Sequence, residues 1–388
     1  VDNVASYFQS SDLFFLPSRM DPFPCVVNEA MASGKPVVLF DQGSGCVDIV
    51  KPDGGAVIPY GDVAAASESI AQLCNAPDQM QRMGARNREY VKRHLKFDDY
   101  VTRLANGLVE SIDPSRHCEV EAAKLFRARV CDFQSDRKRI LFTLPAWNVS
   151  GVNTFVENLI RELLDRNYDA SILFTTRDPD RIEANQMPDV PYRFLASKTL
   201  PPDETRRQLN DYICANAPCV FVPNYDYVAS SITDRLPANV GVMGVLHCDE
   251  DEHYLHAYRM GHYWDAMVAV SHTIASRILK LNPVFEDRLT TIPYGVAVPE
   301  SRPPQNTYAS AIRIAYCGRL VQEQKRVLDF VRLVQCLHER NLPFQLTLIG
   351  DGPDGEQLAS QMQPFMDQGL VRLTGRLNPR EVRQELEQ

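Results

Sequence analysis

The sequence of 388 residues lacks several features that would assign its class at once. It has no run of about eighteen apolar residues that could span a bilayer, and no signal peptide is visible. Acidic residues outnumber basic ones, 50 against 41, so the formal net charge is −9. Because binding of a phosphate backbone needs a basic face, we expect no nucleic acid as partner. A local basic pocket for one phosphorylated small molecule is still compatible with this charge.

Paired cysteines are also missing. The ten cysteines are scattered and none forms a C-x-x-C pair. Cys317 and Cys336 lie in apolar patterns typical of strands or helices, where a reduced, buried thiol is the ordinary state. We therefore expect a reducing, cytoplasmic compartment, with no disulfide framework and no zinc site.

What the sequence does contain is a repeated alternation of strand and helix patterns. Its length predicts two or three domains. In residues 1–105, the pattern predicts strands at 12–17 and 36–40 with a helix at 26–33 between them. Residues 106–137, which are helical in pattern and mixed in charge, are expected to connect this segment to the next.

Residues 138–300 carry a second series, in which strands again alternate with helices and so predict a parallel sheet with covered faces. A linker rich in proline follows, and residues 301–388 restart the pattern. The chain then stops halfway through what resembles another doubly wound domain. The missing half would need a strand, a helix and a strand, which residues 12–40 supply.

The stretch "GRLVQEQKR" directly follows a predicted strand. Gly318 permits a tight turn at the carboxyl end of that strand, where open α/β sheets bind ligands. Arg319 and Lys325 would then place two cations over the crevice, which suits a diphosphate. The alternative is a solvated surface loop.

A second glycine-containing stretch, "LIGDGPDGEQL", has a formal G-x-G-x-x-G at Gly350, Gly352 and Gly355. It follows a later strand of its domain, and no acidic residue stands about twenty positions further on to meet a ribose. Turn chemistry is therefore the favoured interpretation.

Two acids, Asp21 and Glu29, lie on a predicted loop and on the helix after it. Carboxylates near the carboxyl ends of strands accept hydrogen bonds from sugar or ribose hydroxyls. The loop that leads into this helix contains Phe23, Pro24 and Cys25. The backbone amides of Phe23 and Cys25 could reach a phosphate, whereas Pro24 has no N–H. Alternatively, the acids are a general acid and base that hydrolyse a glycoside, or surface acids without a role.

The run "GVLHCDEDEHYLH" raises the question of a metal. Asp249 and Asp251, with His253 and His256, would suit manganese, but the hydrophilic run reads more simply as a solvated loop entering a helix, and we expect no metal. His247 follows an apolar strand at the mouth of the sheet. It is the stronger functional candidate of the run, against a structural histidine.

Together these motifs resemble the retaining GT-B glycosyltransferases of group 1, the large family typified by bacterial mannosyl- and glucosyltransferases. The E-x7-E signature of the family corresponds to Asp21-x7-Glu29, with Asp in place of the first Glu. Arg319 and Lys325 correspond to its phosphate-binding Arg and Lys. "LIGDGP" and "LTGRL" correspond to the strands that wall the nucleotide site, which places Arg376 and Leu377 near the base.

In the other domain of the family, a G-G-V loop lies under the diphosphate. Here the loop reads Ser150-Gly151-Val152, a departure at its first position. His247 corresponds to the histidine that such enzymes place beside the donor sugar and the acceptor.

The resemblance implies two Rossmann-like doubly wound domains and transfer of a sugar, with retention and without a bound metal. The donor would be a nucleotide-diphosphate sugar, and the acceptor a hydroxyl of a glycan, a lipid-linked molecule or a protein, as in polysaccharide biosynthesis. Asp21 would orient the hydroxyls of the donor sugar and Glu29 the ribose. No residue is an obvious covalent nucleophile, which suits a mechanism in which the departing phosphate helps to deprotonate the acceptor.

The order of the segments departs from the family, because the half-domain that carries E-x7-E normally comes last. Since the chain begins with Val1, we expect it to be a piece of a longer protein. A slice through consecutive modules of one polypeptide is favoured over a circular permutant, because a similar helix pattern occurs at both ends. The two half-domains could then complete one site within a chain or across a swapped homodimer.

Three further functions remain open from the sequence. A non-catalytic GT-B module could bind nucleotide or glycan as a scaffold, which the Asp at position 21 and the missing glycine favour. A sugar-nucleotide epimerase shares the two-domain architecture. A dinucleotide-dependent oxidoreductase is a more distant alternative.

Overall fold

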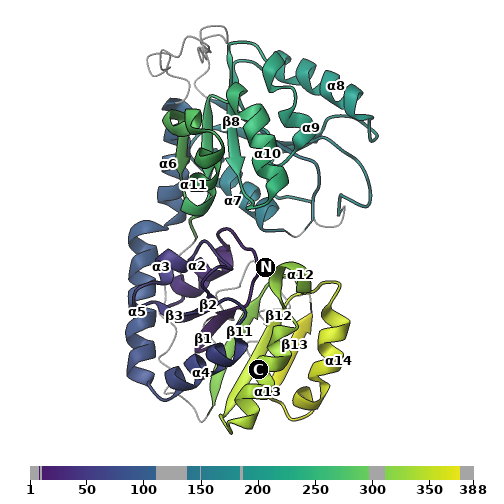
Figure 1. Cartoon of the computed structure of the whole chain (residues 1–388). Coiled ribbons are helices and arrows are strands. Elements are labelled where there is room, and N and C mark those ends of the chain that lie inside the picture. Colours follow the sequence, from purple (N-terminus) through teal and green to yellow (C-terminus); the bar gives the residue numbers. More distant parts are fainter. Residues whose placement is uncertain are drawn as a thin grey trace. The chain divides into compact units, whose positions relative to one another are not determined.

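The computed structural model describes residues 8, 11–110, 138–148, 150–183, 187–296 and 311–375, and the side chains of all of these except 107–110. The chain divides into two compact units (Figure 1). The first unit combines residues 1–97 with residues 294–388, and the second consists of residues 98–293. The sequence placed these boundaries near residues 105 and 300. Most of the expected connector, from residue 111 to 137, lies outside the described residues.

The described residues of the first unit form a six-stranded parallel sheet in the order β13-β12-β11-β1-β2-β3. Strands from both ends of the chain therefore share one sheet, as the colours in Figure 1 show. The strands are β1 (Leu13–Leu16), β2 (Val37–Phe40), β3 (Gly55–Ile58), β11 (Ile312–Cys317), β12 (Phe344–Ile349) and β13 (Val371–Gly375).

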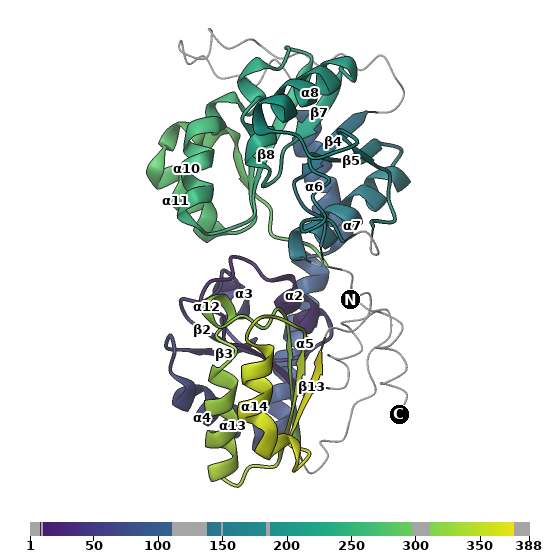
Figure 2. The same ribbon diagram turned by 90° about the vertical axis from the view of Figure 1, so that its right-hand side faces the viewer.

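Helices cover both faces of this sheet, and α13 and α14 lie together on one of them in Figure 2. α4 packs against α13 on that face, whereas α2 packs against α5 on the other. The helices are α2 (Cys25–Ala32), α3 (Val47–Val50), α4 (Val63–Cys74), α5 (Pro77–His94), α12 (Gln322–Lys325), α13 (Asp329–Glu339) and α14 (Gly355–Met366).

The core of the first unit is built from side chains that are remote in sequence. Phe15 of β1 meets Phe330 of α13 edge-to-face, with ring centroids 5.5 Å apart, and Phe40 of β2 at 5.9 Å. All three rings are fully buried. Burial of rings of this size supplies most of the hydrophobic stabilisation of such a layer. The two segments of the chain therefore share one hydrophobic core.

A polar contact fixes the same junction at the amino ends of the strands. Asp12 and Arg313 exchange backbone and side-chain hydrogen bonds, including Arg313 Nη2 to Asp12 Oδ1 at 2.9 Å. The Asp12 side chain is 8% exposed and that of Arg313 is 27% exposed. Because β1 and β11 pair only through Leu13 with Ile314 and Phe14 with Ala315, this contact helps to set their register.

The second unit is also a parallel sheet. In its described residues the strand order is β10-β9-β8-β7-β4-β5-β6. The strands are β4 (Arg139–Leu144), β5 (Asp169–Phe174), β6 (Tyr192–Phe194), β7 (Cys219–Val222), β8 (Val240–Leu246), β9 (Ala266–Ala269) and β10 (Leu289–Thr291).

The helices of this unit are α6 (Phe97–Glu110), α7 (Gly151–Asp165), α8 (Pro202–Ala215), α9 (Tyr227–Ser230), α10 (Asp251–Met260) and α11 (His272–Leu281), with the 3-10 turns η4 (Thr233–Arg235), η5 (Gly261–Tyr263) and η6 (Pro283–Arg288). α6 belongs to this unit because Arg166, at the end of α7, hydrogen-bonds Thr102 Oγ1 at 2.7 Å and forms an ion pair with Asp98.

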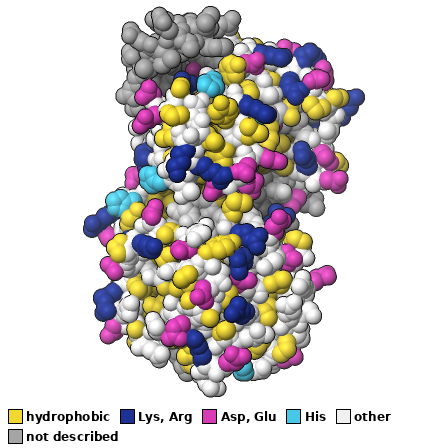
Figure 3. All heavy atoms as spheres, in the orientation of Figure 1, with side chains coloured by type: hydrophobic (Ala, Val, Ile, Leu, Met, Phe, Trp, Pro, Cys, Tyr) yellow, Lys and Arg dark blue, Asp and Glu magenta, His cyan; other side chains and the backbone are white. Residues whose placement is uncertain are grey.

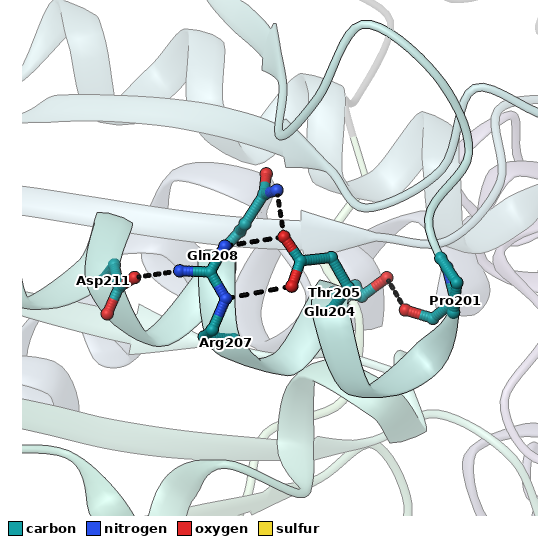
Figure 4. Close-up of polar contacts among 6 residues, drawn as sticks. All are labelled: Pro201, Glu204, Thr205, Arg207, Gln208 and Asp211. Atoms are coloured by element: carbon teal, nitrogen blue, oxygen red, sulfur yellow. Dashed lines mark hydrogen bonds and ion pairs between the residues drawn. The ribbon is translucent and has the colours of Figure 1, made fainter.

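The surface of α8 shows how exposed charges are paired on these helices (Figure 4). Arg207 donates to Glu204 Oε1 at 2.6 Å and to Asp211 Oδ2 at 3.1 Å. The hydrogen bonding of Arg207 to Glu204, with another hydrogen bond from Gln208, lowers the pKa of Glu204 to about 2. Exposed pairs of this kind contribute little to stability. In Figure 3, basic and acidic side chains are likewise interspersed on the visible face of each unit.

The predicted fold class, two Rossmann-like α/β units with parallel sheets, is confirmed. The strands expected at 12–17 and 36–40 and the helix at 26–33 correspond to β1, β2 and α2. No helix in the described part of the chain is long and apolar enough to cross a membrane.

Replacing Arg313 by Met should leave the Asp12 carboxylate largely buried without its cation. We expect Arg313→Met to lower the free energy of unfolding by about 2 kcal/mol, below the cost at a fully buried pair because Arg313 is partly exposed. The control is Arg93→Met, which removes the exposed pair with Glu89 and should cost less than about 0.5 kcal/mol. Urea denaturation measures both, and equal midpoints for the two variants would show that the junction does not depend on this contact.

Candidate functional site

An acid and a cation from opposite ends of the chain meet at the carboxyl ends of β1 and β11. Lys325 Nζ, at the end of α12, forms an ion pair with Asp21 Oδ2 in the loop after β1. Both side chains are mostly buried, 17% and 12% exposed. The backbones also meet, because Arg19 N donates to the Gln324 carbonyl at 2.8 Å. Two residues separated by 304 positions are therefore neighbours at the sheet edge where α/β folds bind ligands.

Asp21 is held on its other side by the loop after β2. Its backbone N donates to the Gly43 carbonyl at 3.0 Å, and its carbonyl accepts from Gly45 N at 3.3 Å. The loop after β1 is thus fixed between α12 and the loop after β2. Pre-organisation of this kind lowers the entropic cost of binding a ligand.

The glycines after β11 and β12 allow two loops to pack backbone against backbone. A Cβ at Gly350 would lie 2.0 Å from the Gly318 carbonyl oxygen, and one at Gly352 would lie 2.3 Å from the Leu320 carbonyl oxygen. Gly350 also has φ +142°, a backbone angle that residues with a side chain rarely adopt. Leu320 N donates to the Asp351 carbonyl at 2.9 Å across the same contact. These glycines therefore serve a close approach of two loops, in line with the turn interpretation.

Arg326 is a residue of this region that sequence reasoning missed. It follows α12 with a left-handed backbone, φ 53°, and its guanidinium donates to Asp329 Oδ2 at 2.7 Å. The same guanidinium lies 5.3 Å from the ring centroid of Tyr60, in the loop after β3. Arg326 thus ties the end of α12 to a strand end from the other chain segment. In the sequence, Arg326 is only a second cation next to Lys325, and nothing there indicates its contacts with Asp329 and Tyr60.

Arg319 is exposed, and its guanidinium has no ion-pair partner among the residues that the structure describes. Asp21 offsets the charge of Lys325, so Arg319 is the uncompensated cation of the loop after β11. An uncompensated cation at a strand end favours an anionic ligand.

The amino terminus of α2 adds donors at the same edge of the sheet. Its N-cap residue is Pro24, no side chain caps the helix, and no acidic residue lies in its first turn. Phe23 is buried before it, and Cys25 is its first residue. Burial, with Glu29 and Asp21 nearby, raises the pKa of the Cys25 thiol, so this cysteine stays protonated. Because no side chain caps the first turn of α2 and no acid lies in it, the amides of this turn carry the partial positive charge of the helix end.

Glu29 lies one turn further along α2 and is only partly exposed. Burial raises the pKa of its carboxyl to about 7. Its charge also raises the pKa of the Cys317 thiol at the end of β11, which burial raises most. Near neutral pH, the Glu29 side chain is therefore present both as the carboxylic acid and as the carboxylate.

His247 lies in the second unit, directly after β8, and is 5% exposed. Its Nε2 contacts Asn224 Oδ1, after β7, at 3.3 Å. The ring also packs against Phe155 of α7, with centroids 5.8 Å apart. Burial lowers the pKa of His247 to about 3, so the imidazole is neutral at physiological pH.

The Ser150-Gly151-Val152 loop lies at the start of α7. Ser150 caps this helix, since its Oγ accepts from Asn153 N at 3.3 Å. Asn153 Nδ2 donates to the Asn148 carbonyl at 3.1 Å, and Asn153 Oδ1 accepts from Tyr225 at 3.0 Å. A Cβ at Gly151 would meet nothing within 4 Å. Gly151 therefore leaves open space at the helix amino terminus, where an anion is favoured.

The acids after β8 are engaged in other contacts. Asp249 Oδ1 accepts from Arg277 Nη1 at 3.0 Å and from the Tyr254 hydroxyl. Asp251 forms an ion pair with the same Arg277. Over the described residues, no group of three or more acids, histidines or cysteines is arranged to hold a metal ion.

The structure thus gathers most of the predicted residues into two groups. One group lies on the first unit, at the carboxyl ends of β1 and β11, and comprises Asp21, Phe23, Pro24, Cys25, Glu29, Gly318, Arg319 and Lys325. The other lies on the second unit and comprises Gly151 and His247. Arg376 and Leu377, expected near a base, lie outside the described residues.

Two family models match the chain. Residues 1–90 match the model described as glycosyl transferases group 1, and residues 149–298 match glycosyltransferase family 4. The first match contains Asp21 and Glu29, and the second contains Gly151 and His247. Residues 1–90 therefore resemble a group 1 glycosyltransferase domain, and residues 149–298 resemble a family 4 glycosyltransferase domain.

Similar curated proteins have related names. An uncharacterised glycosyltransferase of Haemophilus influenzae is 30% identical over 100 residues, which are 26% of this chain and 27% of that protein. N-acetyl-alpha-D-glucosaminyl L-malate synthase of Bacillus anthracis is 31% identical over 102 residues, which are 26% of this chain and 27% of that protein. Each match thus spans about a quarter of the relative's own length.

Among solved structures, the lipopolysaccharide outer core galactosyltransferase WaaB in its apo form is similar at 20% identity and a TM-score of 0.47. That match covers 64% of this chain and 71% of WaaB. A TarM structure is similar at 9% identity and a TM-score of 0.48, over 64% of this chain and 78% of TarM.

Gly352→Ala tests the packing interpretation of the glycine loop. The added methyl group would overlap the Leu320 carbonyl, so we expect a loss of about 2–4 kcal/mol in the free energy of unfolding. Gly355→Ala is the matched control, because its nearest neighbour would be a Leu320 side-chain carbon at 3.5 Å, an ordinary van der Waals contact. Thermal denaturation should therefore show a clear loss of stability for Gly352→Ala and little change for Gly355→Ala. If both were equally stable, the close approach of the loops would not matter.

Glu29 predicts a pH dependence of stability. Its carboxyl binds a proton more tightly in the folded state, so its contribution is complete below the unfolded pKa of about 4.5 and is lost as pH rises to about 7. Glu29→Gln should remove this loss and be more stable than the wild type at pH 8 by up to about 3 kcal/mol. Unfolding by urea at several pH values measures the effect, with the exposed Glu339→Gln as control. Parallel pH profiles for the wild type and Glu29→Gln would contradict it.

Proposed function

We propose that this protein is a glycosyltransferase that moves a sugar from a nucleotide-diphosphate sugar to an acceptor hydroxyl, with retention and without a bound metal. The observation that carries the proposal is the ion pair of Asp21 with Lys325 at the carboxyl ends of β1 and β11, together with the exposed Arg319 that follows β11. The names of the curated relatives support the same reaction class. The sugar, the base and the acceptor are not assigned.

The first unit would bind the donor through its diphosphate. Arg319 supplies an uncompensated guanidinium, and the amino terminus of α2 supplies amide donors. Lys325 already stands beside Asp21 and would contact the phosphate from that position, while the Asp21 carboxylate orients sugar hydroxyls. Fixed cations and amides stabilise the charge that develops on a departing diphosphate without reorganising.

Glu29 would hold the ribose of the donor. A carboxyl with a pKa of about 7 can accept from a hydroxyl when ionised and both donate and accept when protonated. Glu29 lies on α2, the helix whose amino terminus supplies the proposed amide donors.

The second unit would serve the acceptor and the transferred sugar. His247 is a buried neutral imidazole, which suits hydrogen bonding to a sugar hydroxyl. Gly151, with open space before α7, would allow a phosphate close to the helix amino terminus. No covalent nucleophile is assigned, so the departing phosphate would assist the deprotonation of the acceptor.

We further propose that one chain completes one donor-binding domain, in permuted order. The position of β1 between β2 and β11 supports this arrangement, because the E-x7-E segment and the Arg-Lys segment then share a sheet within the chain. It makes a swapped homodimer unnecessary for completing that domain. The alternative of a slice through consecutive modules predicts that additional segments are needed for activity.

The proposal is tested by binding and turnover together. We expect Arg319→Ala to weaken binding of uridine, guanosine or adenosine diphosphate, whichever binds the wild type, by about 10- to 100-fold, the usual loss for a hydrogen bond to a charged group. Arg332→Ala, an exposed arginine on α13, should not change it. Calorimetry gives the affinity, and release of nucleoside diphosphate from the matching nucleotide sugar gives turnover.

The outcomes separate the candidate functions. Binding that Arg319→Ala weakens, together with turnover, supports the transferase. Nucleotide binding without turnover in the presence of candidate acceptors would favour a scaffold module instead. A new sugar isomer on the nucleotide would favour an epimerase, and unchanged binding in Arg319→Ala would contradict the assigned phosphate site.

A further inference from the structure

The loop that carries Arg319 is fixed by backbone hydrogen bonds on both sides of this residue. Gly318 N donates to the Ile349 carbonyl at 3.0 Å, and Leu320 N donates to the Asp351 carbonyl at 2.9 Å. These hydrogen bonds join the loop after β11 to the end of β12 and to the loop after β12. The carbonyl of Arg319 is held differently, because it accepts a hydrogen bond from a side chain.

That side chain is Tyr316, which belongs to β11. Its hydroxyl donates to the Arg319 carbonyl at 3.1 Å, and Val321 N donates to the same oxygen at 3.0 Å. A carbonyl oxygen has two lone pairs, so these two donors use both of them. The hydroxyl is therefore a support of the Arg319 peptide group that a substitution can remove without changing the backbone sequence of the loop.

The position of the hydroxyl is set by packing. Tyr316 is 0% exposed, and its ring meets Phe330 of α13 at an interplanar angle of 65°, with ring centroids 5.0 Å apart. Gly318 leaves the space above it, because a Cβ there would lie 2.9 Å from the hydroxyl oxygen and 3.2 Å from Cζ. The φ of Gly318 is not positive, so this glycine serves the approach of the tyrosine and not a left-handed turn.

The hydroxyl is also the part of the tyrosine that packing does not require. Phenylalanine would keep the contact with Phe330 and would leave Gly318 more space. A buried hydroxyl is costly unless it is hydrogen-bonded. What Tyr316 offers beyond a phenylalanine is therefore its hydrogen bond to the Arg319 carbonyl.

The direction of that carbonyl matters for the side chain of Arg319. The carbonyl belongs to the planar peptide group between Arg319 and Leu320, so its direction fixes ψ of Arg319. The hydrogen bond from Val321 closes a γ-turn around Leu320, a turn with one internal hydrogen bond. Because the Arg319 side chain is exposed, the backbone from which it leaves the loop determines which space its guanidinium can reach.

We propose that Tyr316 is a positioning residue of the donor site, whose buried hydroxyl fixes the peptide group after Arg319 and so directs the guanidinium toward an anionic ligand at the carboxyl end of β11. The tyrosine is fully buried and acts through Arg319, without touching the ligand itself. Its hold on the loop is a property of the folded chain, whereas its effect on a diphosphate rests on the function proposed above.

Hydrogen–deuterium exchange of the ligand-free protein tests the hold on the loop. We expect Tyr316→Phe to speed exchange of the Val321 amide by about 3- to 10-fold, because the carbonyl that accepts from it loses its other donor. The matched control is Tyr254→Phe, which removes the hydroxyl of another buried tyrosine, bonded to Asp249 in the second unit. It should leave exchange of Val321 unchanged. An unchanged rate in folded Tyr316→Phe would overturn the proposal.

Binding tests whether the hydroxyl acts through Arg319. Calorimetry with inorganic pyrophosphate and with nucleoside diphosphates should show about 3- to 10-fold weaker binding for Tyr316→Phe, and no change for Tyr254→Phe. In an Arg319→Ala background, Tyr316→Phe should have no further effect. An equal loss in both backgrounds would show that the hydroxyl supports the structure generally, and would overturn its role in directing the guanidinium.

The combined results separate this inference from the proposed function. Binding that Arg319→Ala weakens and Tyr316→Phe does not would support the donor site and overturn the positioning role. A wild type that binds neither pyrophosphate nor any nucleoside diphosphate would contradict the donor site and the effect of Tyr316 on it. Exchange of the Val321 amide would then still decide whether the hydroxyl fixes the loop.

Discussion

The parallel pairing of β1 with β11 is the contact on which the rest of the first unit depends. It joins strands from the two ends of the chain, and it is short, so side-chain contacts on both faces and at the amino ends must hold its register. Phe15 against Phe330 supplies the apolar part, and Asp12 with Arg313 the polar part. Without this pairing, neither segment could bury the exposed edge of its strands.

The candidate donor site is a direct consequence of that pairing. Parallel strands present all their carboxyl ends at one edge, so the loops after β1 and β11 become neighbours there. Asp21 and Lys325 meet for this reason, and the exposed Arg319 nearby has no ion-pair partner among the described residues. In the second unit the same geometry brings Asn224 and His247 together after β7 and β8. There the result is a neutral, buried hydrogen-bonded pair in place of an exposed charge.

The candidate sites could be predicted only in part, and the contacts show why. Residues with strong local signals were found: Asp21 and Glu29 by their spacing before an apolar strand, Lys325 after a strand and a glycine, and His247 at a strand end. Arg326 was missed because its partners, Asp329 and Tyr60, have no common pattern with it in the sequence. Asn224 was missed because its contact with His247 depends on the pairing of β7 with β8, which no local pattern in the sequence reveals.

By itself, the sequence determined the class of the fold and the chemical types at the sites. Apolar strands that alternate with amphipathic helices can bury their surface only as layered α/β units with parallel strands. The elements missing from residues 301–388 also predicted that residues 12–40 complete the same sheet, but only the tertiary structure decided the order and register of its strands. It likewise decided which charges are compensated and which titratable groups are buried. Those properties depend on desolvation and on hydrogen-bond partners, which exist only once the chain has folded.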